Sequence, residues 1–217
     1  MGKKQIIQTW QLYVITDREL STNRSHQDIA RQAIAAGAAV IQLRDKTASG
    51  QELFKTAREL RKLTRDTHTA LIINDRIDIA LAVDADGVHV GQEDIPAAVA
   101  RKLIGNRRIL GVSAGTVQEA IEAEQQGADY LGAGPVFEAR STKADAGEAR
   151  GTNLIREIRE HCTIPVIAIG GIKIENLMEV FQAGASGAAV ISAIVTADDI
   201  ETVTRKFLDV INTTRET

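Results

Sequence analysis

The chain has 217 residues, of which 44% are hydrophobic and 25% charged, so it is long enough for one well-buried core and short for two. Its formal net charge of -3 gives no basic field for nucleic acid or an anionic membrane and favours a small-molecule partner. The single cysteine and the lack of a membrane-length apolar run predict a cytoplasmic protein without an internal disulfide.

Short apolar runs of the β type alternate with helical patterns along the chain, at a spacing of about 25 residues. Glycines at 37, 127 and 184 mark the passages from helix to strand. The expected strands lie near Leu12–Ile15, Val40–Leu43, Ala70–Ile73, Gly87–Val90, Ile109–Val112, Tyr130–Ala133, Pro165–Ile169 and Gly187–Ile191. Eight such units predict an α/β fold, a single-domain TIM (β/α)8 barrel over 1–217, with about 1–10 as an N-terminal extension.

Charged and small polar residues follow directly on most of these apolar runs. The carboxyl ends of barrel strands share one face, so we expect these side chains to converge there. One long segment without a regular pattern, from Phe137 to Gly151, carries Thr142 and Lys143. Loops of that length in a compact domain are typically functional or disordered, and these two residues favour a lid over the site.

Two aspartates, Asp75 and Asp94, follow strands in adjacent units. Mg²⁺ is usually held by one or two carboxylates, with water and substrate phosphate completing its shell, so a magnesium-diphosphate site is chemically sensible. The alternative is that each aspartate caps the helix that follows it. Both interpretations stay open for either residue alone.

Arg44 and Lys46 have the alternating spacing that places two side chains on one face of an extended segment, with Asp45 on the other. Two cations aimed at one place suit a substrate with several negative charges. Simple exposure of a charged triplet to solvent is the alternative, and the position after a predicted strand favours the functional interpretation.

Gly170-Gly171 and Ser192 follow the seventh and eighth predicted strands, where barrels often bind a phosphate through main-chain N–H groups. A tight turn alone would also explain the glycine pair. His89, inside an apolar strand, is interpreted as a hydrogen-bonded core residue, and Cys162 as a packing residue. Signature motifs of serine hydrolases and of Walker-type phosphate loops are absent from the sequence.

Taken together and in order, these motifs resemble the thiamine phosphate synthase family over nearly the whole chain, from about Leu12 to the last helix. The motifs that carry the resemblance are Gln42-Leu43-Arg44-Asp45-Lys46, Ile73-Asn74-Asp75, His89-Val90-Gly91-Gln92-Glu93-Asp94, Gly111-Val112-Ser113-Ala114, Gly134-Pro135-Val136-Phe137, Ser141-Thr142-Lys143, Gly170-Gly171-Ile172 and Ile191-Ser192-Ala193-Ile194.

The resemblance implies a TIM-barrel transferase that needs Mg²⁺ and joins hydroxymethylpyrimidine diphosphate to thiazole phosphate, releasing diphosphate. It implies that the pyrimidine diphosphate is bound by Gln42, Arg44, Lys46, Asn74, Ser113 and Lys143. It implies that the thiazole phosphate is bound by Thr142, Gly171, Ile191 and Ser192. The metal ligands would be Asp75 and Asp94, and the catalytic residues Lys143, Ser113, Arg44 and Lys46.

The loop before Lys143 departs from the family pattern Thr-x-Thr-Lys, because it reads Glu138-Ala139-Arg140-Ser141-Thr142-Lys143 and lacks a clear first threonine. Ser141 or Arg140 could replace that contact. Two rival functions are a thiazole tautomerase, which would need a histidine soon after Ser113, and a non-catalytic barrel that binds thiazole or thiamine phosphate. A homo-oligomer is also left open.

Overall fold

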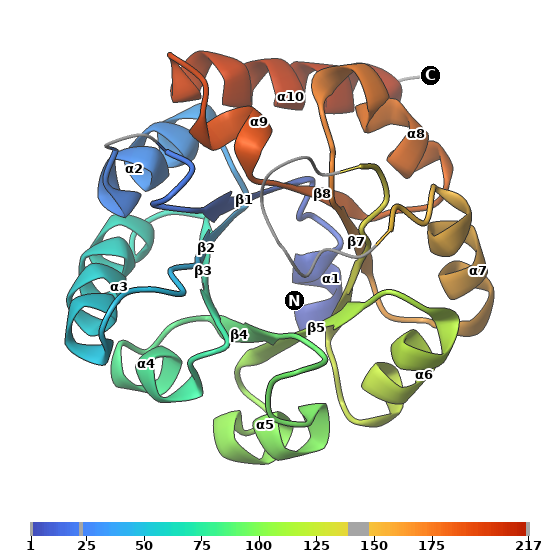
Figure 1. Ribbon diagram of the computed structural model, residues 1–217, viewed down its shortest axis with the longest axis horizontal. Coiled ribbons are helices and arrows are strands. Elements are labelled where there is room, and N and C mark those ends of the chain that lie inside the picture. Colours follow the sequence, from blue (N-terminus) through green and yellow to red (C-terminus); the bar gives the residue numbers. More distant parts are fainter. Residues whose placement is uncertain (1, 22–23, 139–147, 216–217) are drawn as a thin grey trace.

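The computed structural model describes residues 2–21, 24–138 and 148–215 and shows a closed barrel of parallel strands surrounded by helices (Figure 1). Each strand pairs with its neighbours in the chain, and β1 pairs with β8 to close the ring. The strands are β1 Leu12–Thr16, β2 Val40–Leu43, β3 Ala70–Asn74, β4 Gly87–Val90, β5 Ile109–Ala114, β6 Tyr130–Ala133, β7 Val166–Ile169 and β8 Gly187–Val190. The predicted TIM barrel is therefore confirmed.

Some strand ends differ from the prediction by one or two residues. β5 continues through Ser113 and Ala114 because these residues pair with Gly132 and Ala133 of β6. At the start of β7, Pro165 lies outside the strand, although its carbonyl accepts a hydrogen bond from Leu131. Proline has no N–H to donate to the ladder, which explains the later start.

The helices begin and end where local chemistry favours it. The Ser25 side chain accepts a hydrogen bond from the Asp28 N–H at the start of α2, and Gly37 ends that helix at φ 104°. Gly127 and Gly184 also have positive φ after α6 and α8, as the sequence indicated. The helical elements are α1 Lys3–Ile7, α2 His26–Ala36, α3 Gly50–Thr64, α4 Ile77–Ala82, α5 Ala97–Ile104, α6 Val117–Gln125, α7 Asn153–His161, η1 Ile174–Asn176, α8 Leu177–Gln182, α9 Ser192–Val195 and α10 Ile200–Arg215.

The first helix, α1, lies across the amino ends of the strands (Figure 1). Lys3 Nζ forms an ion pair with Oδ1 of Asp129 at 2.8 Å, and Asp129 is the residue directly before β6. Ile7 and Trp10 are almost completely buried, and the Trp10 ring meets the ring of Tyr13 edge-on inside the barrel. This segment therefore closes the barrel at the amino ends of the strands. The carboxyl ends of the strands stay available for a site.

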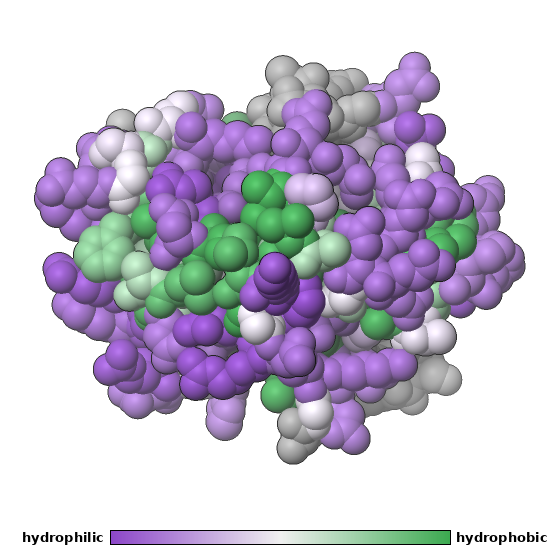
Figure 2. Space-filling view, turned by 90° about the horizontal axis from the view of Figure 1, so that it is seen from below, coloured by the Kyte–Doolittle hydropathy of each residue, from purple (hydrophilic) through white to green (hydrophobic). Residues whose placement is uncertain are grey.

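One side of the molecule carries an apolar patch, formed by α4, α5 and the segment between them (Figure 2). Its large exposed side chains are Leu81, Ile95, Val99 and Leu103. Contiguous apolar surface of this kind is typical of contact areas. None of the described helices combines the length and apolar character needed to cross a membrane.

Candidate active site

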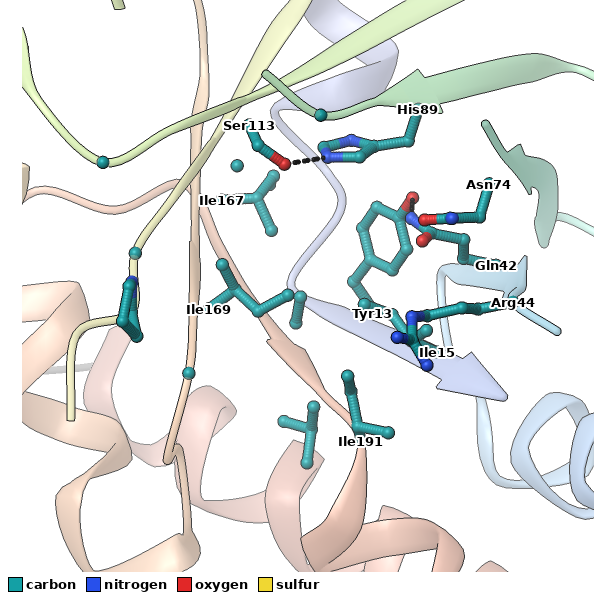
Figure 3. A pocket seen from close by; sticks show the side chains of 18 of the residues that line it. Tyr13, Ile15, Gln42, Arg44, Asn74, His89, Ser113, Ile167, Ile169 and Ile191 are labelled. Carbon is teal, nitrogen blue, oxygen red and sulfur yellow. Dashed lines mark hydrogen bonds between the residues drawn. The ribbon is translucent and has the colours of Figure 1, made fainter. Parts of the chain in front are cut away.

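A pocket of about 540 Å³ opens among the carboxyl ends of the strands (Figure 3). This volume is in the usual range for small-molecule sites. Every predicted site residue that the structure describes lines it: Gln42, Arg44, Lys46, Asn74, Asp75, Asp94, Ser113, Gly171, Ile191 and Ser192. Thr142 and Lys143, with Arg140 and Ser141, lie outside the described residues.

Arg44 is held on one side of the pocket by Asp17, a buried residue that sequence reasoning missed. The Arg44 guanidinium forms an ion pair with the Asp17 carboxylate, and the two side chains are 11% and 6% exposed. The other Asp17 oxygen, Oδ1, accepts the N–H of Leu20 at 3.1 Å. Asp17 directly follows β1, so the same position after a strand that indicated the other residues could have identified it.

Asp45 points away from the pocket, while Arg44 and Lys46 on either side of it line the pocket. Its carboxylate contacts His26 Nε2 at 3.2 Å and accepts the N–H groups of Thr47 and Ala48. Burial acts to raise the pKa of Asp45, but these hydrogen bonds outweigh burial and the pKa is lowered. Burial lowers the pKa of His26 despite the neighbouring carboxylate. This pair fixes the segment that carries the two cations.

Asp75 and Asp94 do not occupy the N-cap positions of the helices that follow them. The N-cap positions of α4 and α5 are Arg76 and Pro96, without a side-chain cap, so the capping alternative is wrong. Asp94 instead accepts the N–H of Gly91 at 2.7 Å. Asp75 has the left-handed value φ 61°, which is uncommon outside glycine and often marks a functional position.

These two carboxylates are a donor set that suits Mg²⁺ better than a metal bound by protein alone. Among the described residues, no group of three or more His, Cys, Asp or Glu side chains could hold a metal ion. Mg²⁺ commonly binds one or two carboxylates and takes its remaining ligands from water and substrate phosphates. Asp75 and Asp94 in one pocket with two cations fit that requirement.

The opposite side of the pocket contains Gly170 and Gly171, which have φ values of 98° and 63°. A Cβ on Gly171 would lie 2.7 Å from the carbonyl oxygen of Glu138. Conformation and close packing therefore explain both glycines without a ligand. Within the described chain, neither N–H is hydrogen-bonded to a protein acceptor, so both can serve a phosphate.

The floor of the pocket contains His89, Tyr13 and Tyr130, none of which was predicted as a site residue. His89 is half-buried and lines the pocket, so its interpretation as a core residue was incomplete. Its ring has room because Gly111 and Gly132 lack side chains: a Cβ there would lie 2.5 Å and 2.9 Å from His89 ring atoms. Glycines inside apolar strands signal such close approaches and could have revealed it.

Further polar residues around the rim were also missed by the sequence analysis. Glu119 accepts the N–H of Gly115 at 2.6 Å, and Gln92 donates to the carbonyl of Ser113 at 2.6 Å. Glu93 and Arg150 line the pocket as well. They lie in turns and helix starts, where charged residues are common in any sequence.

Comparisons with known proteins identify the family of the chain. The family model described as thiamine monophosphate synthase matches residues 12–194. A thiamine-phosphate synthase of Chloroflexus aurantiacus is 52% identical over 207 residues, which are 95% of this chain and 95% of that protein. One of Methanospirillum hungatei is 53% identical over 200 residues, 92% of this chain and 97% of that one.

Solved structures show the same relationship. A thiamine phosphate pyrophosphorylase from Pyrococcus furiosus has a TM-score of 0.88 and 42% identity, covering 96% of this chain and 98% of that one. A 3-hexulose-6-phosphate synthase, with a TM-score of 0.72 and 18% identity over 92% of this chain and 99% of that one, shares the fold. From the matches in sequence and structure over nearly its whole length, the chain belongs to the thiamine-phosphate synthase family of transferases.

Proposed function

We propose that this pocket joins hydroxymethylpyrimidine diphosphate to thiazole phosphate, giving thiamine phosphate and diphosphate. The observation that carries the proposal is that one pocket combines two kinds of anion site. Arg44, Lys46 and the two aspartates suit a metal-bound diphosphate. Across the pocket, Gly171 and Ser192 suit a phosphate monoester, so that two phosphorylated substrates can meet between them.

In the proposed reaction, the bond between the pyrimidine methylene carbon and the diphosphate oxygen breaks first, and the electron pair leaves with the diphosphate. The thiazole nitrogen then donates its lone pair to the resulting pyrimidine methyl cation. Arg44 and Lys46 stabilise the negative charge that develops on the leaving group, an effect worth several kcal/mol in enzymes that use it. The steps need no covalent nucleophile. Lys143 and Thr142 are proposed to complete the two anion sites.

Asp75 and Asp94 are proposed to hold Mg²⁺, because both carboxylates line the diphosphate side of the pocket. When bound, the ion supplies positive charge to the leaving diphosphate. The Gly91 N–H holds Asp94 through Oδ2, and this contact orients the carboxylate. A homo-oligomer and a cytoplasmic location stay predictions.

The test is an assay of purified protein with Mg²⁺ and both substrates, in which thiamine phosphate and diphosphate should form in equal amounts. Asp94→Ala should lower turnover by roughly a hundredfold, as expected when one preorganised charge-stabilising group is lost. Lys143→Ala should have a similar effect. Glu59→Ala is a control on the exposed face of α3, and it should retain full activity. No product from the unaltered protein would refute the proposal, and tautomerisation of the thiazole alone would favour the rival function.

A further inference from the structure

A continuous hydrogen-bond chain crosses the floor of the pocket and joins two predicted pyrimidine contacts, Gln42 and Ser113. Figure 3 shows its last bond, between His89 and Ser113. Gln42 Nε2 donates to Tyr13 Oη at 2.6 Å, and Tyr13 Oη lies 2.9 Å from Tyr130 Oη. Tyr130 Oη lies 3.0 Å from His89 Nδ1, and His89 Nε2 lies 2.9 Å from Ser113 Oγ. We call these five residues the floor chain.

When the His89 ring is neutral and carries one hydrogen, the hydrogens of the floor chain all follow one direction. Both phenols are buried, and burial raises the pKa of Tyr13 and of Tyr130, so each phenol stays neutral and carries a single hydrogen. With Gln42 donating to Tyr13, the Tyr13 hydroxyl donates to Tyr130 and Tyr130 donates to His89 Nδ1. His89 Nε2–H then donates to Ser113, whose own O–H is left to point at a ligand.

If every hydrogen bond of the floor chain is reversed, each contact still contains one hydrogen. If only part of the chain is reversed, one contact is left without a hydrogen. If Gln42 and Ser113 were both to offer hydrogens to a ligand, Tyr13 would donate toward Gln42 and Tyr130 toward His89. The two phenol oxygens would then face each other at 2.9 Å with no hydrogen between them. A buried contact of two acceptors without a hydrogen is costly, because neither group can turn to water.

We propose that Tyr13, Tyr130 and His89 are positioning residues that couple the two ends of the floor chain. When Gln42 presents its Oε1 acceptor to the ligand, Ser113 presents a donor, and the reverse holds when the chain reverses. This inference rests on the proposed function and deepens it. The pocket thereby selects a pyrimidine that offers one donor and one acceptor, as an exocyclic amine beside ring nitrogens does.

The packing around the floor chain holds its members in place. A Cβ at position 111 would collide with the Tyr130 ring, so β5 has no side chain there and the ring reaches His89. Trp10 packs edge-on against both phenol rings, with centroids 5.9 Å from Tyr13 and 5.5 Å from Tyr130. Because these rings are held from below, the two hydroxyls stay in contact.

The experiment compares two unreactive ligands by calorimetry, the hydroxymethylpyrimidine monophosphate and its analogue with methoxy in place of the amine. The analogue offers acceptors only, so the unaltered protein should bind it about tenfold or more weakly, the usual consequence of a mismatched buried hydrogen bond. In Tyr130→Phe the contact between the phenols is gone and both ends can donate. The ratio of the two dissociation constants should then fall to about threefold or less.

The controls separate coupling from packing. Tyr13→Phe should shift the ratio as Tyr130→Phe does, and the double variant should shift it no further. Trp10→Phe disturbs the packing of the same rings but keeps every hydroxyl, so it should leave the ratio unchanged. If Tyr130→Phe weakens both ligands equally, the rings have a structural role only and the proposal is overturned. That outcome leaves the synthase assay unaffected, whereas failure of the unaltered protein to form thiamine phosphate would refute the proposed function itself.

Discussion

Replacing Asp17 by asparagine tests whether this buried carboxylate holds Arg44 for the diphosphate. Asp17 uses Oδ1 for the Leu20 N–H and Oδ2 for the Arg44 guanidinium. Asparagine has nearly the same volume but only one acceptor oxygen, so its NH₂ must face one of these two donors. Asp17→Asn therefore removes one hydrogen bond and the charge pairing without creating a cavity.

The expected loss in the free energy of unfolding is about 2 kcal/mol. A charge-assisted hydrogen bond is worth roughly 1.5–3 kcal/mol, and breaking a fully buried ion pair costs roughly 3–5 kcal/mol. The Arg44 side chain is 11% exposed and lines the pocket, which favours the lower value because water can partly replace Asp17. Urea unfolding at neutral pH measures this difference.

Calorimetry with inorganic pyrophosphate tests the same substitution at the site, and Asp17→Asn should weaken binding by roughly tenfold or more as Arg44 loses its fixed orientation. Glu59→Gln is the matched control, since Glu59 pairs with Lys62 on the exposed face of α3 and should leave stability and binding unchanged. If Asp17→Asn behaves like this control, Asp17 does not hold Arg44.

Three further predictions concern other residues. The His26 pKa is lowered by burial, so the unfolded state binds more protons and stability should fall as the pH drops below the ordinary value of 6.5; urea unfolding should show a smaller fall in His26→Gln. Burial, with Glu124 nearby, raises the pKa of Cys162 to about 11, so a thiol reagent at pH 8 should modify the native protein far more slowly than the unfolded one. Rapid native labelling would contradict the buried placement. Gly171→Ala should lower the midpoint of thermal unfolding and weaken thiazole phosphate binding, because alanine at φ 63° is strained and its Cβ meets the Glu138 carbonyl; unchanged values would show that this turn can relax.

The barrel fold could be predicted from the sequence, and so could the positions of the polar residues that follow its strands. Short apolar runs of the β type and glycine stops are local signals, so Gly37 and the ends of β2 and β4 were predicted correctly. Local spacing also brought Arg44 and Lys46 to the pocket and turned Asp45 away from it.

Contacts between distant segments could not be predicted in this way. Tyr13 and Tyr130 are separated by 117 positions, and an aromatic residue in an apolar run looks like ordinary core. Only the register of the closed barrel shows that their hydroxyls meet. The capping alternative for Asp75 and Asp94 failed for a similar reason, because it depended on where α4 and α5 begin, and helix ends are the least certain part of a sequence prediction.

The position of Trp10 gives this protein a built-in optical probe. It is the single tryptophan of the chain, it is buried, and its ring touches both phenol rings at the base of the pocket. Selective excitation of the indole thus reports from one known point rather than from an average over many. Tryptophan emission recorded during a ligand titration will report changes in the surroundings of Trp10 at the base of the pocket. The protein needs no attached label for this measurement.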